Sequence, residues 1–516
     1  MNLAAALCAP AATAPDRPAL RTPAGVVTHG ELAARAGRAH ALLADRAGPG
    51  ARVAILAGTE PAFVTAFLGA LGAGAVAVPL NPAAPSHELA RDLSAVTPEI
   101  VVASAAYADL GRRARAHAGS EAPLLVLDDA ASAATRSLPP VDRAAGDLAV
   151  LLFTAGTAGP PKAAMLTHGS LLANLEQMQG HPGLRIGPDD VALGVLPLFH
   201  VFGCNVVLGL ALYAGASVAL VEHFHPAEAL ARLRTDGVTV VAAVPAVYAA
   251  WVALPDAPAD AFAGVRLCVS GAAALPDEVA AAMRERFGVD VHQGYGLTEA
   301  SPVVTTTAVA PAPRPGSIGP PLPGVEVRLV DRDGRDVLEG DAGEIWVRGP
   351  NVFAGYWEDP DATAAVLTPD GWLRTGDVAV ADEDGWLTLV DRAKDVVIVS
   401  GFNVYPGEVE DALAGHPDVA EVAVTGEPHP RTGETVVAYV VPRPGRHPDP
   451  VGLLRHAGRR LARYKLPTRI EVVDGLPRSA TGKLLRRELG RPGGGPGSPP
   501  TPAGPVPPAG EPGATL

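Results

Sequence analysis

The sequence predicts an α/β protein with a large N-terminal domain of parallel βαβ units and a smaller α+β domain behind it. In the first half of the chain, apolar runs typical of buried strands alternate with amphipathic helical stretches. From about Val325 the pattern changes to short alternating strands separated by Asp-Gly turns, which indicates a β-rich subdomain. With 516 residues, the chain is also too long for one compact core.

The first elements follow from local signals. The opening MNLAAALCAP has no basic residue before Arg17, so it predicts the start of a helix and not a signal peptide. Thr28 and Glu31 form a T-x-x-E capping box that opens an amphipathic helix ending near Gly48. Strands are then predicted over 53–57, 74–80 and 100–103, with helices over 60–71 and 87–96 between them.

A glycine-rich loop follows the strand-like run 149–153. It reads TAGTAGPPK from Thr154 to Lys162, and its glycines let backbone N–H groups approach an anion closely. Threonine hydroxyls and the lysine add further donors, so the loop suits a polyphosphate. Its spacing differs from the common P-loop, and a surface loop of small residues is the alternative interpretation.

The rest of the chain continues both domains. The apolar run 206–221 contains two glycines and is too short to span a bilayer, so it predicts a buried helix and then a buried strand. Strands are expected over 265–270 and 289–292, and a β-rich subdomain over about 325–390. Residues 395–490 predict an α+β unit with a helix over about 406–414 and a last helix from Leu484. Nine prolines and seven glycines in 491–516 predict a disordered tail.

Composition excludes several functions. The net charge of −14 argues against nucleic acid as a partner. Three scattered cysteines without metal spacing fit a reducing compartment, so we expect a cytoplasmic protein without an integral membrane segment. There is no G-x-S-x-G elbow to suggest a serine hydrolase.

Further motifs follow the loop in order: LPLFHVFG (196–203), SGAAAL (270–275), QGYGLTE (293–299), GWLRTGD (371–377), DRAKD (391–395), SGFNVYPGEVE (400–410) and PRSATGK (477–483). Together with the loop they resemble the AMP-forming adenylating enzymes: acyl-CoA synthetases, aryl-CoA ligases, luciferases and peptide-synthetase adenylation domains. The resemblance runs from about residue 20 to 490. It implies an adenylation domain over 1–393 and a mobile C-terminal lid domain over 394–490.

The resemblance implies a site for ATP and Mg²⁺. Tyr295 presents a flat ring between two glycines, against which adenine would stack. Thr298 offers a hydroxyl to a phosphate, and an unpaired Glu299 carboxylate beside a phosphate loop suits Mg²⁺. Asp377 would accept both ribose hydroxyls, and Arg392 would contact ribose and phosphate. The other implied nucleotide-binding residues are Thr154, Ala155, Gly156, Thr157, Ala158, Gly159, Lys162, Gln293, Gly294, Gly296 and Leu297.

The acid site is also implied by the resemblance. His200 matches a histidine beside the path of the carboxylate and γ-phosphate, although a core histidine is the plain alternative. The implied pocket residues are Phe202, Cys204, Asn205, Val206, Ser270, Gly271, Ala272 and Ala273. No aspartate occurs over 196–206 to pair an α-ammonium, which argues against an amino acid. We therefore expect a fatty acid, with an aryl acid as the alternative.

The C-terminal motifs imply a two-step reaction. Lys483 matches the lysine that bridges the acid and the α-phosphate during adenylation, and Lys394 matches the hinge. Gly401, Phe402 and Asn403 match the loop that later admits a thiol. Coenzyme A is the expected acceptor, and a basic cluster suits its phosphates: Arg455, Arg459, Arg460, Arg463 and Lys465.

Two rival functions stay open. The adenylate could be transferred to a carrier-protein thiol or to another nucleophile of a biosynthetic pathway. A non-catalytic nucleotide-binding module is the alternative of another class. The phosphate loop also departs from the family pattern, because Ala155, Ala158 and Ala163 stand where Ser, Thr and Gly are usual. Two hydroxyl donors are lost, which predicts a weaker hold on pyrophosphate.

Overall fold

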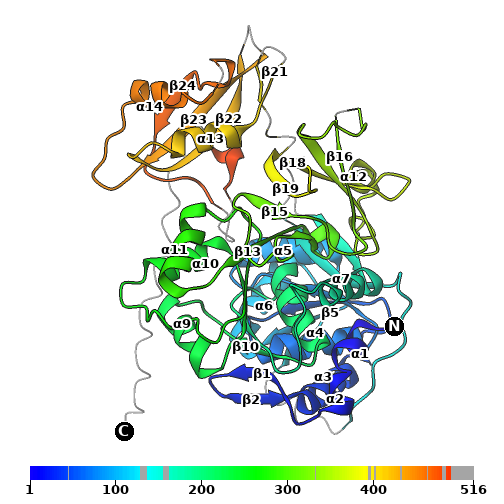
Figure 1. Cartoon of the computed structure of the whole chain (residues 1–516). Helices are drawn as coiled ribbons and strands as arrows, with labels where there is room; N and C mark the ends of the chain where they lie inside the picture. Colours follow the sequence, from blue (N-terminus) through cyan, green and yellow to red (C-terminus); the bar gives the residue numbers. More distant parts are fainter. Residues whose placement is uncertain are drawn as a thin grey trace, which may run out of the picture. The chain divides into compact units, whose positions relative to one another are not determined.

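A computed structural model describes residues 1–44, 46–127, 136–154, 162–331, 333–392, 395, 397–399, 402–429, 433–461, 463–478 and 484–489. The chain divides into two compact units, Met1–Leu389 and Val390–Leu516 (Figure 1). The division falls a few residues before the boundary expected at 393. The predicted tail over 491–516 lies outside the described residues.

The first sheet of the large unit has six strands in the order β6-β5-β3-β4-β7-β8. All neighbours pair in parallel except β7 and β8, which form an antiparallel edge. The expected strands at 53–57, 74–80 and 100–103 are therefore confirmed. The strands are β3 (Arg52–Leu56), β4 (Val76–Pro79), β5 (Ile100–Ser104), β6 (Leu124–Leu127), β7 (Leu148–Thr154) and β8 (Lys162–Thr167).

Helices cover both faces of this sheet, as βαβ connections require. Val53 and Ile55 face the main core together with α4 (Pro61–Gly72), which is buried on nearly every side. Ala54 and Leu56 face a second core, which α5 (Ser86–Val96) and α6 (Ala108–Ala118) close. The strands are apolar on both faces for this reason.

The predicted capping box opens α3 (His29–Ala44). The Thr28 N–H donates to Glu31 Oε2 at 3.0 Å, and the Glu31 N–H donates to Thr28 Oγ1 at 3.2 Å. The N-terminal helix is α1 (Leu3–Leu7), as expected from the opening residues. Along the chain, α2 (Pro10–Thr13) separates these two helices.

The second sheet has eight strands in the order β14-β13-β12-β11-β9-β10-β1-β2. Its centre is parallel, and antiparallel pairs close both edges. The strands are β1 (Pro18–Thr22), β2 (Gly25–Thr28), β9 (Val191–Gly194), β10 (Ser217–Leu220), β11 (Val240–Ala243), β12 (Leu267–Ser270), β13 (Val291–Gly296) and β14 (Val303–Thr306). Helix α7 (His168–Gly180) leads from the first sheet into this one, and its connecting helices include α9 (Pro226–Thr235), α10 (Pro245–Ala253) and α11 (Asp277–Phe287).

The apolar run 206–221 forms helix and then strand, as predicted. Its helix begins earlier, as a π-helical segment η3 (Phe202–Gly209), and continues into α8 (Leu210–Tyr213) before β10. π-Helical turns are rare and often occur at functional sites. Among the described residues, no helix has the length and apolar character needed to cross a bilayer.

The β-rich subdomain is a five-stranded sheet in the order β15-β19-β18-β17-β16. It begins with β15 (Ser317–Gly319), earlier than the predicted residue 325, because this short strand pairs with β19 (Leu387–Arg392). Gly334, Gly371 and Gly385 in the Asp-Gly turns all have positive φ. The other elements are β16 (Glu326–Val330), β17 (Gly343–Arg348), α12 (Pro360–Val366) and β18 (Leu373–Ala381).

The second unit pairs β21-β20-β23-β22, with β24 beside β23. Its expected helix is confirmed as α13 (Pro406–Ala414). The helix predicted from Leu484 is wrong for the residues described there, which form only the 3₁₀ turn η6 (Arg486–Glu488), since Gly490 and Pro492 follow closely. The other elements are β20 (Val397–Val399), β21 (Phe402–Val404), β22 (Val419–His429), β23 (Gly433–Pro442), α14 (Pro450–Ala457) and β24 (Arg469–Val472).

Asp190 ties together the starts of three central strands. Its carboxylate accepts two hydrogen bonds from Arg266, at 2.8 and 2.7 Å, and one from the Thr239 hydroxyl at 2.7 Å. These residues directly precede β9, β12 and β11. Burial by itself would raise the pKa of Asp190, but the hydrogen bonds and the Arg266 charge hold it at about 2.

We predict that Asp190→Asn destabilises the protein by on the order of 2 kcal/mol at pH 7. The folded-state pKa lies below the unfolded value, so this contribution is complete above about pH 4 and is lost as the pH falls towards 2. Thermal unfolding of both proteins over pH 7 to 3 should show their difference shrinking. Asp189→Asn is the control, because that side chain is 97% exposed. Equal effects of the two substitutions would contradict the prediction.

Candidate functional site

Three predicted motifs meet at one edge of the eight-stranded sheet. The parallel strands β9, β11, β12 and β13 end there, and LPLFHVFG, SGAAAL and QGYGLTE lie at or just beyond the ends of three of them. In open parallel sheets, ligands bind outside the carboxyl ends of the strands. The structure therefore brings together motifs that are far apart in the sequence.

The residues predicted for the acid pocket include one close pair. A Cβ atom at Gly271 would lie 3.1 and 3.2 Å from the ring carbons Cε1 and Cζ of Phe202, so the ring lies directly over the glycine. Ser270 is 1% exposed, and its hydroxyl has no hydrogen-bond partner among the described residues. Ala272 and Ala273 are exposed, and Ala272 has φ +69°. A positive φ at a residue with a Cβ is strained, and such strain is often found at binding sites.

Asn205 and Cys204 are occupied by the protein itself. The Asn205 amide donates to the carbonyls of Leu171, at 3.3 Å, and Ser301, at 2.8 Å. It thereby joins η3 to α7 and to the residues after Glu299. Burial raises the pKa of the Cys204 thiol to about 12, so it is a neutral core group. A role of Asn205 in acid binding stays a prediction, because its amide N–H groups already have partners.

His200 lies in the turn that leads into η3. Its carbonyl accepts from the Cys204 N–H at 2.8 Å, and its ring is 4.6 Å from that of Phe199. Burial lowers the pKa of His200 to about 4, so the imidazole is neutral near pH 7. His200 can therefore hydrogen-bond a carboxylate or phosphate, but it offers no positive charge.

Tyr295 and Asp377 form a pair between two motifs. The Tyr295 hydroxyl, on β13, donates to Asp377 Oδ2, on β18, at 2.8 Å. The strand β18 is held next to Asp377, because the Gly376 N–H, at a residue with φ +72°, donates to Glu344 Oε1 at 2.9 Å. The nucleotide residues predicted in the two stretches thus lie beside each other.

The two glycines that flank Tyr295 have different surroundings. A side chain at Gly296 would collide with the Pro302 carbonyl, so this glycine is needed for close backbone packing. No atom lies within 3.4 Å of a Cβ placed at Gly294, so only that glycine is free for the predicted stacking role. The Gln293 side chain accepts from the Leu275 N–H at 3.0 Å and donates to the Ser317 carbonyl at 3.3 Å. It anchors the motifs to the small sheet.

Glu299 is not an unpaired carboxylate, which corrects the expectation from the sequence. It lies in the 3₁₀ turn η4 (Thr298–Ala300), and its Oε1 accepts a hydrogen bond from the Tyr356 hydroxyl at 2.6 Å. Oε2 has no hydrogen bond within the described residues. Burial and the negative charge of Glu299 raise the pKa of Tyr356 above its ordinary value, which keeps this donor protonated.

Tyr356 is a site residue that sequence reasoning missed. It belongs to the stretch NVFAGYW (351–357), which lies along β8: the Ala354 N–H donates to Met165 O, and the Trp357 N–H donates to Ala163 O. The Phe353 N–H donates to the Glu299 carbonyl at 2.9 Å. The only signal for Tyr356 in the sequence was a group of three aromatic residues around one glycine, just before the Asp359 helix cap.

The two ends of the phosphate loop are placed together. Thr154 and Lys162 pair across the antiparallel β7–β8 edge, and the Thr154 hydroxyl donates to the Lys162 carbonyl at 3.3 Å. Lys162 Nζ lies 5.1 Å from the centre of the Tyr356 ring. Lys162, on the six-stranded sheet, thus lies next to Tyr356, which hydrogen-bonds to Glu299.

Several predicted residues lie outside the described part of the chain: Ala155, Gly156, Thr157, Ala158, Gly159, Lys394, Gly401 and Lys483. For Arg392, Phe402 and Asn403 only the strand positions, in β19 and β21, are described. The roles of all these residues stay predictions. In the basic cluster, Lys465 already pairs with Glu408 at 2.5 Å.

The residues around Glu299 suit Mg²⁺ bound together with a nucleotide. Magnesium commonly takes one or two carboxylates and fills its other positions with water and phosphate oxygens. Glu299 Oε2 could supply one such ligand while Tyr356 fixes the other oxygen. Within the described ranges, no three His, Cys, Asp or Glu side chains gather into a protein-only metal site.

The two parallel α/β sheets, with three of the predicted motifs gathered at the carboxyl edge of one of them, agree with the adenylating enzyme that the sequence predicts. The sequence pattern of the family described as "AMP-binding enzyme" matches residues 8–357, and that of its C-terminal domain matches 408–483. The chain belongs to this family, which confirms the resemblance to AMP-forming adenylating enzymes.

Individual relatives agree with this assignment. The chain is 39% identical to a feruloyl-CoA synthase of Amycolatopsis sp over 486 residues, which covers 92% of this chain and 96% of the relative. It is 40% identical to a long-chain-fatty-acid–CoA ligase of Bacillus subtilis, over 66% of this chain and 61% of the relative. The ATP-bound structure of MatB from Rhodopseudomonas palustris has a TM-score of 0.88 at 34% identity, and the match covers 95% of this chain and 98% of MatB.

We predict that Tyr356→Phe slows adenylate formation about ten- to a hundredfold, because a hydrogen bond to a charged group contributes about 1.5–3 kcal/mol. ATP–pyrophosphate exchange measures this step. If the tyrosine acts through Glu299, adding Tyr356→Phe to Glu299→Gln should cost little more than Glu299→Gln alone. Losses that multiply in the double variant would show that the two residues act independently.

Proposed function

We propose that this protein is an acid–coenzyme A ligase that activates a hydrophobic carboxylic acid through an acyl-adenylate. The observation that carries the proposal is the set of contacts at the end of β13: the Tyr295–Asp377 pair, the Tyr356–Glu299 pair and the contact of Lys162 with the Tyr356 ring. A non-catalytic nucleotide-binding module would have no need for the second pair, which presents a carboxylate ready to accept a cation.

In the first step, a carboxylate oxygen of the acid attacks the α-phosphorus of ATP. The bond to the bridging oxygen breaks, and pyrophosphate leaves with the electron pair. Mg²⁺ would neutralise charge on the phosphates, and Glu299 would hold it, positioned by Tyr356. Asp377 orients the ribose, and neutral His200 offers a hydrogen bond at the acid. The protein contributes mainly position and charge.

In the second step, the thiol of coenzyme A attacks the acyl carbonyl of the adenylate. A thioester forms, AMP leaves, and the thiol proton is released. Lys483 would serve only the first step, and the loop at Gly401 would admit the thiol in the second. Arg455, Arg459, Arg460 and Arg463 remain candidates for the phosphates of the cofactor, whereas the pairing of Lys465 with Glu408 makes it less available.

For the acid, we place aryl acids of hydroxycinnamate size ahead of fatty acids. The full-length similarity to a feruloyl-CoA synthase supports this order, because the match to the fatty-acid ligase covers only part of both chains. The Phe202 ring over Gly271 offers a flat apolar wall. The buried Ser270 hydroxyl has no hydrogen-bond partner among the described residues, and a substituent on an aromatic ring could supply one. The sequence predicts a fatty acid, and a panel of acids tests both alternatives.

An acid panel decides the substrate class. We expect ferulate, coumarate and benzoate to release AMP with coenzyme A faster than octanoate or dodecanoate does, and all of them faster than free amino acids. Gly271→Ala should raise the KM of ring acids several-fold and leave the KM of ATP unchanged, because the added Cβ would press on the Phe202 ring. A preference for dodecanoate would overturn the aryl order, and a preference for amino acids would overturn the hydrophobic class.

The acceptor is tested in the same assay with either free coenzyme A or a phosphopantetheinylated carrier protein. Thioester on coenzyme A is the expected result. Thioester on the carrier alone would refute the coenzyme A assignment, while the adenylation step would stand.

Lys483→Ala separates the two steps. We expect adenylate formation to fall on the order of 10²–10³-fold, because one preorganised electrostatic contact is lost at the transition state. Thioester formation from a supplied acyl-adenylate should be nearly unchanged, which also shows that the variant is folded. Pyrophosphate exchange at the normal rate would end the assignment of Lys483.

A further inference from the structure

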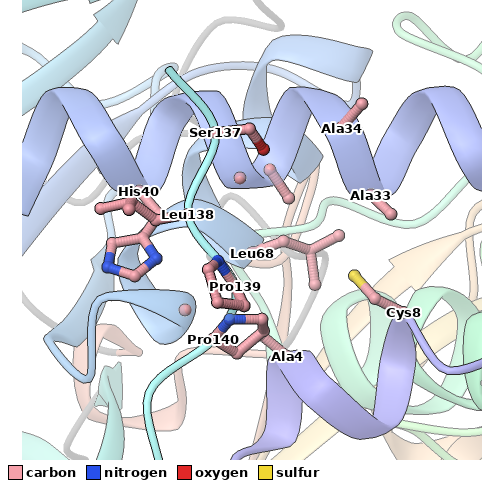
Figure 2. A pocket seen from close by; sticks show the side chains of 13 residues that line it. Ala4, Cys8, Ala33, Ala34, His40, Leu68, Ser137, Leu138, Pro139 and Pro140 are labelled. Atoms are coloured by element: carbon pink, nitrogen blue, oxygen red, sulfur yellow. The ribbon is translucent and has the colours of Figure 1, made fainter.

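A cavity lies in the large unit, apart from the adenylation motifs. Its volume is about 370 Å³, and none of its lining residues belongs to the site described above. It is bounded by α1, α3, α4 and an extended segment, residues 136–141, which we call the strap. Figure 2 shows His40 and Leu138 on one side of the cavity and Cys8 and Ala33 on the other, with Pro139 and Pro140 between them.

The walls are mostly apolar, with the Ser137 hydroxyl as an exception, and they are held in place. Among the described residues, no charged side chain lines the cavity, whose small residues leave the space: Ala4, Ala33, Ala34, Ala36, Gly37 and Gly72. The strap is fixed to both helices, because the Leu138 N–H donates to the Gly37 carbonyl at 3.0 Å and the Val141 N–H to the Gly72 carbonyl at 2.9 Å. The Asn2 amide donates to the Leu71 and Val141 carbonyls, at 2.6 and 2.9 Å, and secures α1 as the third wall. The cavity is therefore preformed.

His40 is the polar group that needs an explanation. The residue is 5% exposed, it lines the cavity, and its Nδ1 has no hydrogen-bond partner among the described residues. In the tautomer with the proton on Nε2, Nδ1 carries a lone pair that can accept a hydrogen bond from a ligand. Burial lowers the pKa of His40, so the ring is neutral. A buried nitrogen without a hydrogen-bond partner is unfavourable, and a donor from a ligand would supply that partner.

The other polar groups favour a neutral ligand. Burial raises the pKa of the Cys8 thiol to about 11, so it lines the cavity as a neutral, weakly polar group. Within the described lining, an anion would find no cationic side chain and a cation would find no carboxylate. The charge of Arg136, at the start of the strap, adds to burial in lowering the pKa of His40, but Arg136 is not one of the lining residues. The volume lies within the range of pockets that hold small organic molecules.

We propose that this cavity binds a neutral, largely apolar small molecule with one hydroxyl group, whose O–H donates to Nδ1 of His40. An aromatic alcohol fits this description, because its ring would contact the apolar lining residues Leu68, Pro139 and Pro140 while its hydroxyl group meets the histidine. The site is separate from the adenylation site and does not depend on the identity of the activated acid.

The probe is 2-naphthol. The control compound is 2-methoxynaphthalene, which has a similar shape but no hydrogen-bond donor. Calorimetry or ligand-observed NMR on the full-length protein should show naphthol binding about two- to tenfold more tightly, the range expected for one hydrogen bond. His40→Phe keeps a flat ring and should remove this preference. Absence of naphthol binding, or equal affinity for the two probes, would overturn the proposal.

Ala34→Leu tests the location without disturbing the buried histidine. The larger side chain should occupy the cavity and weaken naphthol binding at least tenfold. Ala41→Leu, on the same helix but not in the lining, should leave binding unchanged. Both variants should form thioester at the wild-type rate, which shows that they are folded. If Ala34→Leu binds naphthol normally, the probe lies elsewhere and the assigned site is wrong.

Discussion

The candidate site depends on the parallel pairing of β9, β11, β12 and β13, because that pairing brings the carboxyl ends of all four strands to one edge. Asp190 supports the arrangement from the opposite edge by joining the residues that start three of these strands. The helices between the strands bury their apolar sides in one continuous core. The loops at the carboxyl edge can therefore carry strained or polar residues without serving as the source of stability.

Two tyrosine–carboxylate hydrogen bonds join the motifs into one site. Tyr295 links the eight-stranded sheet to the small sheet through Asp377, and Tyr356 links the strand after the phosphate loop to Glu299. In both pairs the neutral hydroxyl steadies a carboxylate and leaves its negative charge in place. This suits groups expected to meet ribose hydroxyls and a cation, since their charge must be present before the ligand arrives.

Two buried polar groups of the large unit differ in how they are satisfied. Asp190 accepts hydrogen bonds from Thr239 and Arg266, whereas Nδ1 of His40 has no hydrogen-bond partner among the described residues. The adenylation site and the His40 cavity lie on different elements of one unit, and their lining residues do not overlap. A second ligand could therefore bind this protein without competing for the nucleotide.

The sequence by itself determined mainly those features that depend on residues close together in the chain. Alternating apolar strands and helices, the Thr28–Glu31 capping box and the Asp-Gly turns predicted the elements correctly, because each depends on residues close together in the chain. The ordered motifs identified the family for the same reason. The helix expected from Leu484 failed where too few residues precede Gly490 and Pro492.

Only the tertiary structure decided which side chains meet. The hydrogen bond from Tyr356 to Glu299 joins residues 57 positions apart, and that from Tyr295 to Asp377 spans 82. Burial by distant elements makes His200 neutral, and the backbone at Pro302 dictates glycine at 296. Such contacts depend on how the sheets pack and have no local pattern, so the sequence could name the participants without pairing them.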